Sequence, residues 1–160
     1  MKKNILSLTI LLLLAALLFH GCTGSTAEND HGHEHGDLPY EWSGELNLEI
    51  GTYEITFEES EDESMDLAFV LMDGSITDLE HHGQHVLEAE KEVIAADGTF
   101  TALPDYGYTL KLNPAGTHFY FTIEEAGRYM LFAEHLPEEF NLQFLGQTGE
   151  VLTPENQITH

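Results

Sequence analysis

Residues 46–57 read LNLEIGTYEITF, and apolar and polar side chains alternate along the stretch. The alternation is interrupted once, at Gly51 and Thr52, where small and polar residues indicate a turn. The apolar positions are Leu46, Leu48, Ile50, Tyr53, Ile55 and Phe57. A period of two is typical of β-strands that bury one face. The stretch therefore predicts two strands joined by a tight turn.

Strand-like patterns continue as far as residue 145. Residues 65–72 are almost continuously apolar, which indicates a central strand. Shorter runs follow at residues 99–102, 106–112, 118–123, 128–134 and 140–145, and we expect the last of these to be the final strand. Seven to nine short strands at this spacing predict an all-β fold, a β-sandwich.

One short helical segment is expected near residues 78–90. Thr77 or Asp78 is a candidate N-cap, and Glu80 lies in the first turn. A rough apolar stripe is formed by Leu79, Val86, Leu87 and Ala89. Gly83 weakens the helix, so only one to two turns are predicted.

The N-terminal residues indicate export. Lys2 and Lys3 precede an apolar run over residues 5–19, which is shorter than the roughly 20 residues of a spanning helix. The run ends at Gly21 and Cys22, a pair that resembles the lipobox of bacterial lipoproteins. We predict a signal peptide over residues 1–21 and a lipid on Cys22 that holds the protein in the membrane. The alternative is an ordinary cleaved signal with an incidental cysteine.

This resemblance implies an extracytoplasmic location in the cell envelope, either in the periplasm or on the outer surface. Cys22 is the only cysteine, so no disulfide framework exists. Residues 22–38 are polar and predict a flexible tether. Residues 39–149 predict the folded domain, and residues 150–160 predict a loose tail.

The acidic composition excludes nucleic acid as a partner. The chain has 29 acidic and 5 basic residues and a formal net charge of −24, and Lys2 and Lys3 belong to the predicted signal peptide. Too few basic side chains remain to neutralise phosphates. The acidity suits a solvated surface in a saline or alkaline exterior, and a negative field also concentrates cations.

Histidines cluster in two places, and neutral imidazole is a common ligand of zinc, copper and nickel. His31, His33 and His35 alternate within the tether, where they are candidates for a segment that collects metal ions. A polar linker with chance histidines is the alternative.

The second cluster contains His81, His82 and His85. On a helix, the pair His81 and His85 projects from one face, as does the pair His82 and His85, so either pair suits a shared ion. The segment lacks the glutamate of the His-Glu-x-x-His motif, so no hydrolytic base is expected. Surface histidines without a ligand role are the alternative.

Two histidines do not complete a site, so a third ligand is needed. We expect His135 to converge with the His81–His85 segment, and Glu134 to act as a fourth ligand or to support one. His118 is a possible ligand if the helical segment covers the outer face of its strand.

Residues 121–129 read FTIEEAGRY, and a hydrophobic strand then leads into EHLPEE at residues 134–139. This part of the chain, residues 117–145, resembles the C-terminal end of cupredoxin-like domains, in which a Gly-x-Tyr strand runs into a ligand-bearing loop. The resemblance implies a cupredoxin-like or Ig-like β-sandwich. A blue-copper site needs a cysteine thiolate, and none lies near His135. A site of nitrogen ligands, with or without carboxylates, is expected instead.

The whole arrangement resembles His-rich, metal-associated lipoproteins. It implies binding of a divalent transition metal, most of all Zn, with Cu or Ni as alternatives, for capture, buffering or delivery to a transporter or metallochaperone. An envelope interaction module with incidental metal binding is the alternative function. No catalytic triad, phosphate loop or base beside a metal site is present in the sequence, so we do not expect an enzyme.

Overall fold

The computed structural model describes residues 38–160. The predicted signal peptide, the predicted lipidation site Cys22 and the tether histidines His31, His33 and His35 lie outside the described residues. Within the described range, no helix is both long and apolar enough to cross a bilayer.

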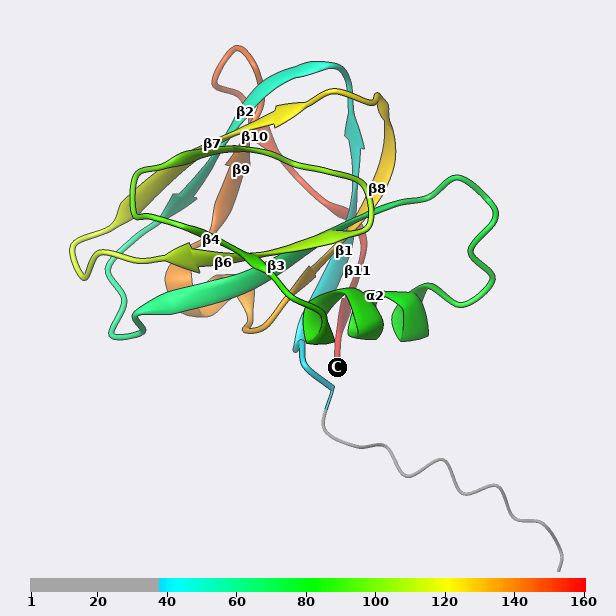
Figure 1. The fold of residues 1–160 in the computed structure, drawn as a ribbon. Helices are drawn as coiled ribbons and strands as arrows, with labels where there is room; N and C mark the ends of the chain where they lie inside the picture. Colours follow the sequence, from blue (N-terminus) through cyan, green and yellow to red (C-terminus); the bar gives the residue numbers. More distant parts are fainter. Residues whose placement is uncertain (1–37) are drawn as a thin grey trace, which may run out of the picture. The chain divides into compact units, whose positions relative to one another are not determined.

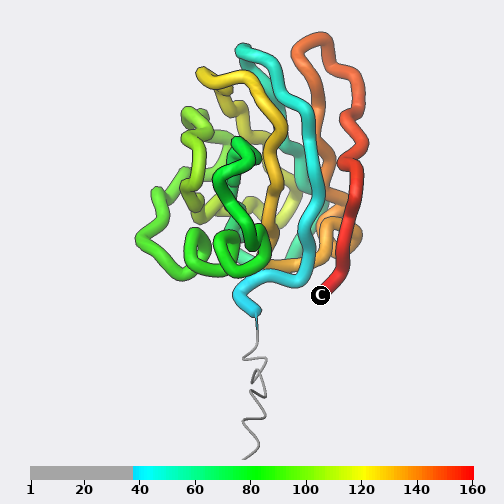
Figure 2. The backbone as a smooth tube through the Cα atoms, turned by 90° about the vertical axis from the view of Figure 1, so that its right-hand side faces the viewer, coloured from blue at the N-terminus to red at the C-terminus, as the bar shows by residue number. Residues whose placement is uncertain are grey.

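The described residues form two facing β-sheets, which confirms the all-β sandwich (Figures 1 and 2). One sheet has six strands in the order β11-β1-β8-β3-β6-β4, and the other has five in the order β10-β9-β2-β7-β5. Neighbouring strands are antiparallel except in the pairs β4–β6 and β5–β7. The strands are β1 (Trp42–Leu48), β2 (Gly51–Phe57), β3 (Ser64–Leu71), β4 (Glu92–Ile94), β5 (Thr99–Thr101), β6 (Tyr106–Lys111), β7 (Thr117–Ile123), β8 (Gly127–Ala133), β9 (Gln143–Leu145), β10 (Val151–Leu152) and β11 (Glu155–Thr159).

The turn predicted at Gly51 and Thr52 joins strands of different sheets. β1 pairs with β8 and β11, whereas β2 pairs with β7 and β9. The hydroxyl of Tyr53 accepts a hydrogen bond from the Glu49 amide at 2.9 Å and donates one to the Glu49 carbonyl at 3.0 Å, which braces the turn. Ile50 is the one apolar residue of the alternating stretch that stays exposed, because it lies in this turn.

The core lies between the sheets and is rich in aromatic side chains. Phe69 of β3 contacts Phe121 of β7 across the sandwich, with ring centroids 5.3 Å apart. Full burial of each such ring stabilises the fold by about 1.5–3 kcal/mol. β3 lies between β8 and β6 and is buried on both faces, as its continuous apolar run predicts.

Among the described residues, the α-helix α2 (Leu79–Glu88) covers the outer face of the six-stranded sheet (Figure 1). Asp78 is its N-cap, and a side-chain oxygen of Asp78 accepts the His81 amide at 3.0 Å. The helix has 10 residues and is longer than the predicted one to two turns. Its buried face packs on a second apolar cluster that includes Val86, Leu87 and Phe132. This burial explains the extra length, because packing outweighs the weak propensity of Gly83.

The C-terminal segment corrects the predicted loose tail. Residues 140–145 are not the last strand: a 3-10 helix, η2 (Pro137–Phe140), precedes the short β9, and β10 and β11 follow. β11 pairs with β1 along the edge of the six-stranded sheet (Figure 2). Glu155–Thr159 lacks an apolar period because its side chains are exposed, so its order comes from backbone pairing. The strand total therefore exceeds the predicted seven to nine.

Candidate metal-binding sites

The predicted histidines do not converge on one site. Among residues 38–160, one group of three or more potential ligands has all its ligand atoms within 4.8 Å of one another, and its members are Glu41, His135 and Glu139. His135 therefore lies beside two carboxylates, but His81, His82, His85 and Glu134 do not belong to the group. The single shared site predicted from the sequence is replaced by two separate places on the surface.

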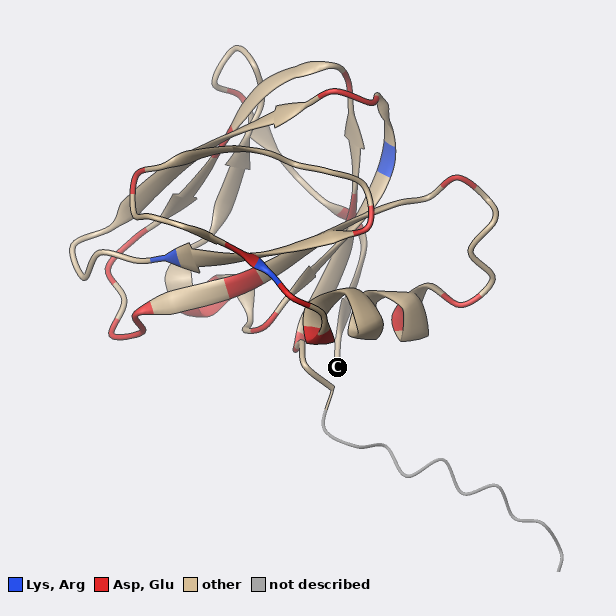
Figure 3. Cartoon of the chain, viewed as in Figure 1, with Lys and Arg blue, Asp and Glu red and all other residues tan. Residues whose placement is uncertain are grey.

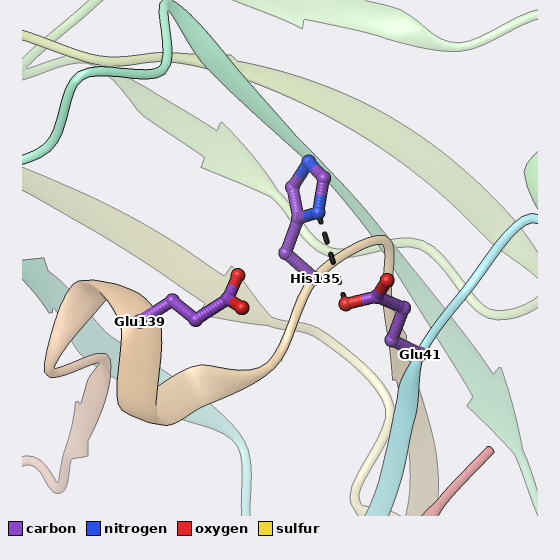
Figure 4. A group of neighbouring side chains, drawn as sticks. All are labelled: Glu41, His135 and Glu139. Carbon is purple, nitrogen blue, oxygen red and sulfur yellow. Dashed lines mark ion pairs between the residues drawn. The ribbon is translucent and has the colours of Figure 1, made fainter.

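The first place, which we call the EHE site, consists of Glu41, His135 and Glu139 (Figure 4). The Nδ1 atom of His135 lies 3.9 Å from a carboxylate oxygen of Glu41. The three residues come from the segment before β1, the loop after β8, and η2. Both glutamates are exposed and His135 is half-buried, so their side chains can adjust around an ion.

Backbone contacts hold the EHE site together. The Glu41 amide donates to the Ala133 carbonyl at 3.0 Å, and the Glu41 carbonyl accepts the His160 amide at 2.9 Å. The Glu139 amide donates to the Leu136 carbonyl at 3.1 Å and closes the 3-10 turn. These bonds fix the backbone of Glu41 and Glu139 on either side of His135, which lowers the entropic cost of gathering the three side chains.

The second place is the exposed face of α2. The Nε2 atoms of His81 and His85 lie 3.1 Å apart. A carboxylate oxygen of Glu88 lies 3.7 Å from Nδ1 of His85. The sequence left open whether His81 or His82 pairs with His85, and the structure selects His81.

His82 points away from this pair. Its Nε2 lies 3.3 Å from a carboxylate oxygen of Asp105, in the loop before β6. That nitrogen is buried and makes no well-directed hydrogen bond within the described residues. His82 therefore links the helix to the loop and does not join His85.

Glu134 has a structural role. Its carboxylate accepts the Asp66 amide at 3.1 Å, and its own amide donates to the Asp66 carbonyl at 3.0 Å. Asp66 also pairs with Lys91 at 3.1 Å. These contacts connect the end of β8 to β3. They engage the Glu134 carboxylate, which was predicted to be a ligand.

His118 lies on the outer face of the five-stranded sheet, because Phe119 points into the core. Its Nδ1 lies 2.7 Å from a carboxylate oxygen of Glu54. The helix contacts β3, β6 and β8 of the other sheet, so the condition set for His118 as a ligand is not met. His160 is also engaged, with Nε2 3.0 Å from the Ser43 hydroxyl.

Negative charge surrounds both places. Acidic residues are spread over the strands and loops, and the only basic side chains among residues 38–160 are Lys91, Lys111 and Arg128 (Figure 3). Arg128 pairs with Glu45, and Lys91 pairs with Asp66. The resulting field attracts divalent cations.

Tyr40 connects the start of the domain to the helix. Its hydroxyl donates to the Glu80 carbonyl at 3.2 Å. Burial, reinforced by the negative charges of Glu80 and Asp78, raises the pKa of Tyr40 to about 12. The hydroxyl therefore remains a neutral donor throughout the neutral range.

Sequence reasoning missed two of the three members of the EHE site. Glu139 follows His135 by four residues, a spacing that a single helical turn brings together, and this signal was available. Glu41 is 94 positions before His135, and only the pairing of β1 with β8 brings it close. No local pattern marks such a residue.

Comparisons of the chain with protein-family models, with curated proteins and with solved structures found no match.

Proposed function

We propose that the protein is a lipid-anchored protein of the cell envelope that binds a divalent transition metal at the EHE site. The observation that carries the proposal is the convergence of three ligand atoms, from Glu41, His135 and Glu139, within 4.8 Å. The three residues come from separate segments of the chain. The lipid on Cys22 and the extracytoplasmic location rest on the N-terminal sequence.

The ligand set favours zinc. One imidazole nitrogen and two carboxylate oxygens are usual zinc ligands, with bonds of about 2.0–2.2 Å. Cu(II) and Ni(II) accept the same donors. Bonds of this length need the Glu41 oxygen and the His135 nitrogen to approach from their 3.9 Å separation by a small side-chain rotation, which the exposed Glu41 allows.

Three protein ligands leave one position of a tetrahedral ion open. An ion with an open position exchanges more readily than one in a closed structural site, because an incoming ligand can bind before the others leave. This favours capture and delivery to a transporter or metallochaperone over permanent storage.

The tether suits the role of a collector. His35 precedes Glu41 by six residues, and an extended chain spans at most about 3.6 Å per residue. At most about 22 Å of extended chain therefore separates this histidine from the first residue of the EHE site. Ions held by His31, His33 and His35 would be released close to the folded ligands.

Calorimetric titration with zinc tests the proposal. The chain from residue 22, with Cys22→Ser and with His31, His33 and His35 replaced by Asn, isolates the folded domain. We expect His135→Ala to weaken the affinity of the EHE site for zinc at least tenfold. Glu138→Gln is the matched control, because Glu138 is also exposed and acidic, lies beside Glu139 and is outside the site. Equal zinc affinity in the parent, His135→Ala and Glu139→Gln proteins would contradict the proposal.

A further inference from the structure

The His81–His85 pair has the spacing of two ligands on one metal ion. Two nitrogens bound at 2.0–2.1 Å in a tetrahedral site are about 3.3–3.4 Å apart. The two Nε2 atoms are 3.1 Å apart in this structure. The spacing of four residues places both imidazoles on one face of the helix.

The second ring nitrogen of His85 has a partner that suits a metal ligand. The Glu88 carboxylate lies 3.7 Å from Nδ1 of His85, and its other oxygen accepts a hydrogen bond from Gln84 at 2.9 Å. A carboxylate behind a metal-bound imidazole orients the ring and favours the tautomer whose Nε2 is free to bind. In that tautomer the Nε2 atom of His85 is free to bind an ion, and it lies 3.1 Å from Nε2 of His81.

The described residues supply only this pair of ligands at the position between the two Nε2 atoms. Among residues 38–160, no third His, Asp or Glu ligand atom joins the two imidazoles in a group of three within 4.8 Å. Both histidines are exposed, with the His85 side chain 63% exposed, and they lie on the outer side of α2, away from the sheet. A second chain can therefore reach them.

We infer that one zinc ion joins two copies of the chain through four imidazoles, His81 and His85 of each copy. A two-fold axis through the ion presents the same helix face from both copies, which is the commonest symmetry of protein pairs. Each copy supplies two nitrogen ligands, so two copies supply the four ligands of a tetrahedral zinc ion. The inference concerns a site distinct from the EHE site and extends the proposed metal-binding function.

Charge makes this association depend on the metal. Glu88 lies beside His85 and would face its counterpart across the axis. Like charges repel, so the copies are expected to separate without zinc and to associate more readily when salt screens the repulsion. The two positive charges of the ion offset part of the repulsion where it is strongest.

Analytical ultracentrifugation of the chain from residue 22, carrying Cys22→Ser, tests the inference. We expect a monomer in the presence of a chelator and a dimer in the presence of zinc. Each dimer should bind one zinc ion more than its EHE sites hold. His85→Ala should stay monomeric with zinc. His82→Ala is the matched control, because His82 lies on the same helix but faces Asp105, and it should still dimerise.

Further variants separate this inference from the proposed function. Glu139→Gln should lose zinc binding at the EHE site and still form the zinc dimer. The result for one site is therefore independent of the result for the other. Replacement of His31, His33 and His35 by Asn should also keep the dimer. The inference is overturned if the parent stays monomeric at saturating zinc, if His85→Ala still dimerises, or if the tether substitutions abolish the dimer.

Discussion

Gly83 of α2 lies directly against the ring of Phe132 on β8. A methyl group added at Gly83 would overlap the Phe132 ring carbons, so this glycine is what allows the helix to approach the sheet closely. The contact holds the helix on the sheet, and His81 and His85 lie on the exposed side of that helix. A residue that weakens the helix by propensity thus strengthens its docking.

Gly83→Ala is therefore expected to destabilise the domain. Helix propensity alone predicts a gain of about 1 kcal/mol. Overpacking against Phe132 costs about 1–3 kcal/mol, so we expect a net loss of up to about 2 kcal/mol. Urea unfolding measures the change, with Gln84→Ala on the same helix as control. A higher urea midpoint for Gly83→Ala would show that the helix docks less tightly than described.

The C-terminal strand should contribute to stability. Removal of residues 154–160 takes away β11 and its pairing with β1, together with the hydrogen bond from the Trp42 indole to Gln157 at 3.2 Å. At roughly 1 kcal/mol for each net hydrogen bond, the free energy of unfolding should fall by about 2–4 kcal/mol. Ile158→Thr preserves the backbone pairing and serves as control. An unchanged urea midpoint after truncation would show that residues 154–160 do not stabilise the domain.

Alkaline pH should destabilise the domain through two buried tyrosines. Burial raises the pKa of both Tyr40 and Tyr108 to about 12, from about 10 for an exposed phenol. The neutral phenols stabilise the fold fully below pH 10, and this contribution disappears as the pH rises toward 12. Each residue accounts for about 2–3 kcal/mol.

Urea unfolding between pH 9 and 12 measures this loss. Tyr40→Phe also removes the hydrogen bond to Glu80, so it should start less stable and then lose less stability as the pH rises. Parallel pH profiles for wild type and Tyr40→Phe would show that Tyr40 ionises as easily in the folded state as in the unfolded state.

Cys22→Ala should abolish lipid attachment. The apolar run that ends at Gly21 and Cys22 motivates this expectation, since Cys22 is the only cysteine of the chain. Metabolic labelling with a fatty acid should mark the wild type and leave Cys22→Ala unlabelled, with the variant released or unprocessed. Normal processing and membrane retention of the variant would refute the lipoprotein assignment.

The strands were predictable wherever burial leaves a pattern, which is an alternation where one face is exposed to solvent and a continuous apolar run where both faces are buried. The alternation at residues 46–57 and the continuous run at residues 65–72 both report burial, and burial is what the sandwich imposes. β11 escaped prediction because every one of its side chains is exposed, so its sequence carries no period. The partition of β1 and β2 into opposite sheets was also hidden, because a short turn suits a hairpin as well as a crossing between sheets.

The candidate sites were predictable only in part. Helical spacing correctly placed His85 beside a histidine neighbour, and packing then chose His81 by turning His82 toward Asp105. His135 lies in the loop after β8, and its neighbour Glu139 was accessible from the spacing of four residues, whereas Glu41 comes close only through the way the chain folds. Long-range neighbours of this kind leave no local pattern.

Anomalous diffraction at the zinc absorption edge tests the central claim most directly. Crystals of the chain from residue 22 with Cys22→Ser are grown with zinc, and the anomalous map is inspected at the EHE site. The account predicts a peak within about 2.0–2.2 Å of ligand atoms from Glu41, His135 and Glu139. Strong zinc peaks elsewhere, with none between these three side chains, would contradict it.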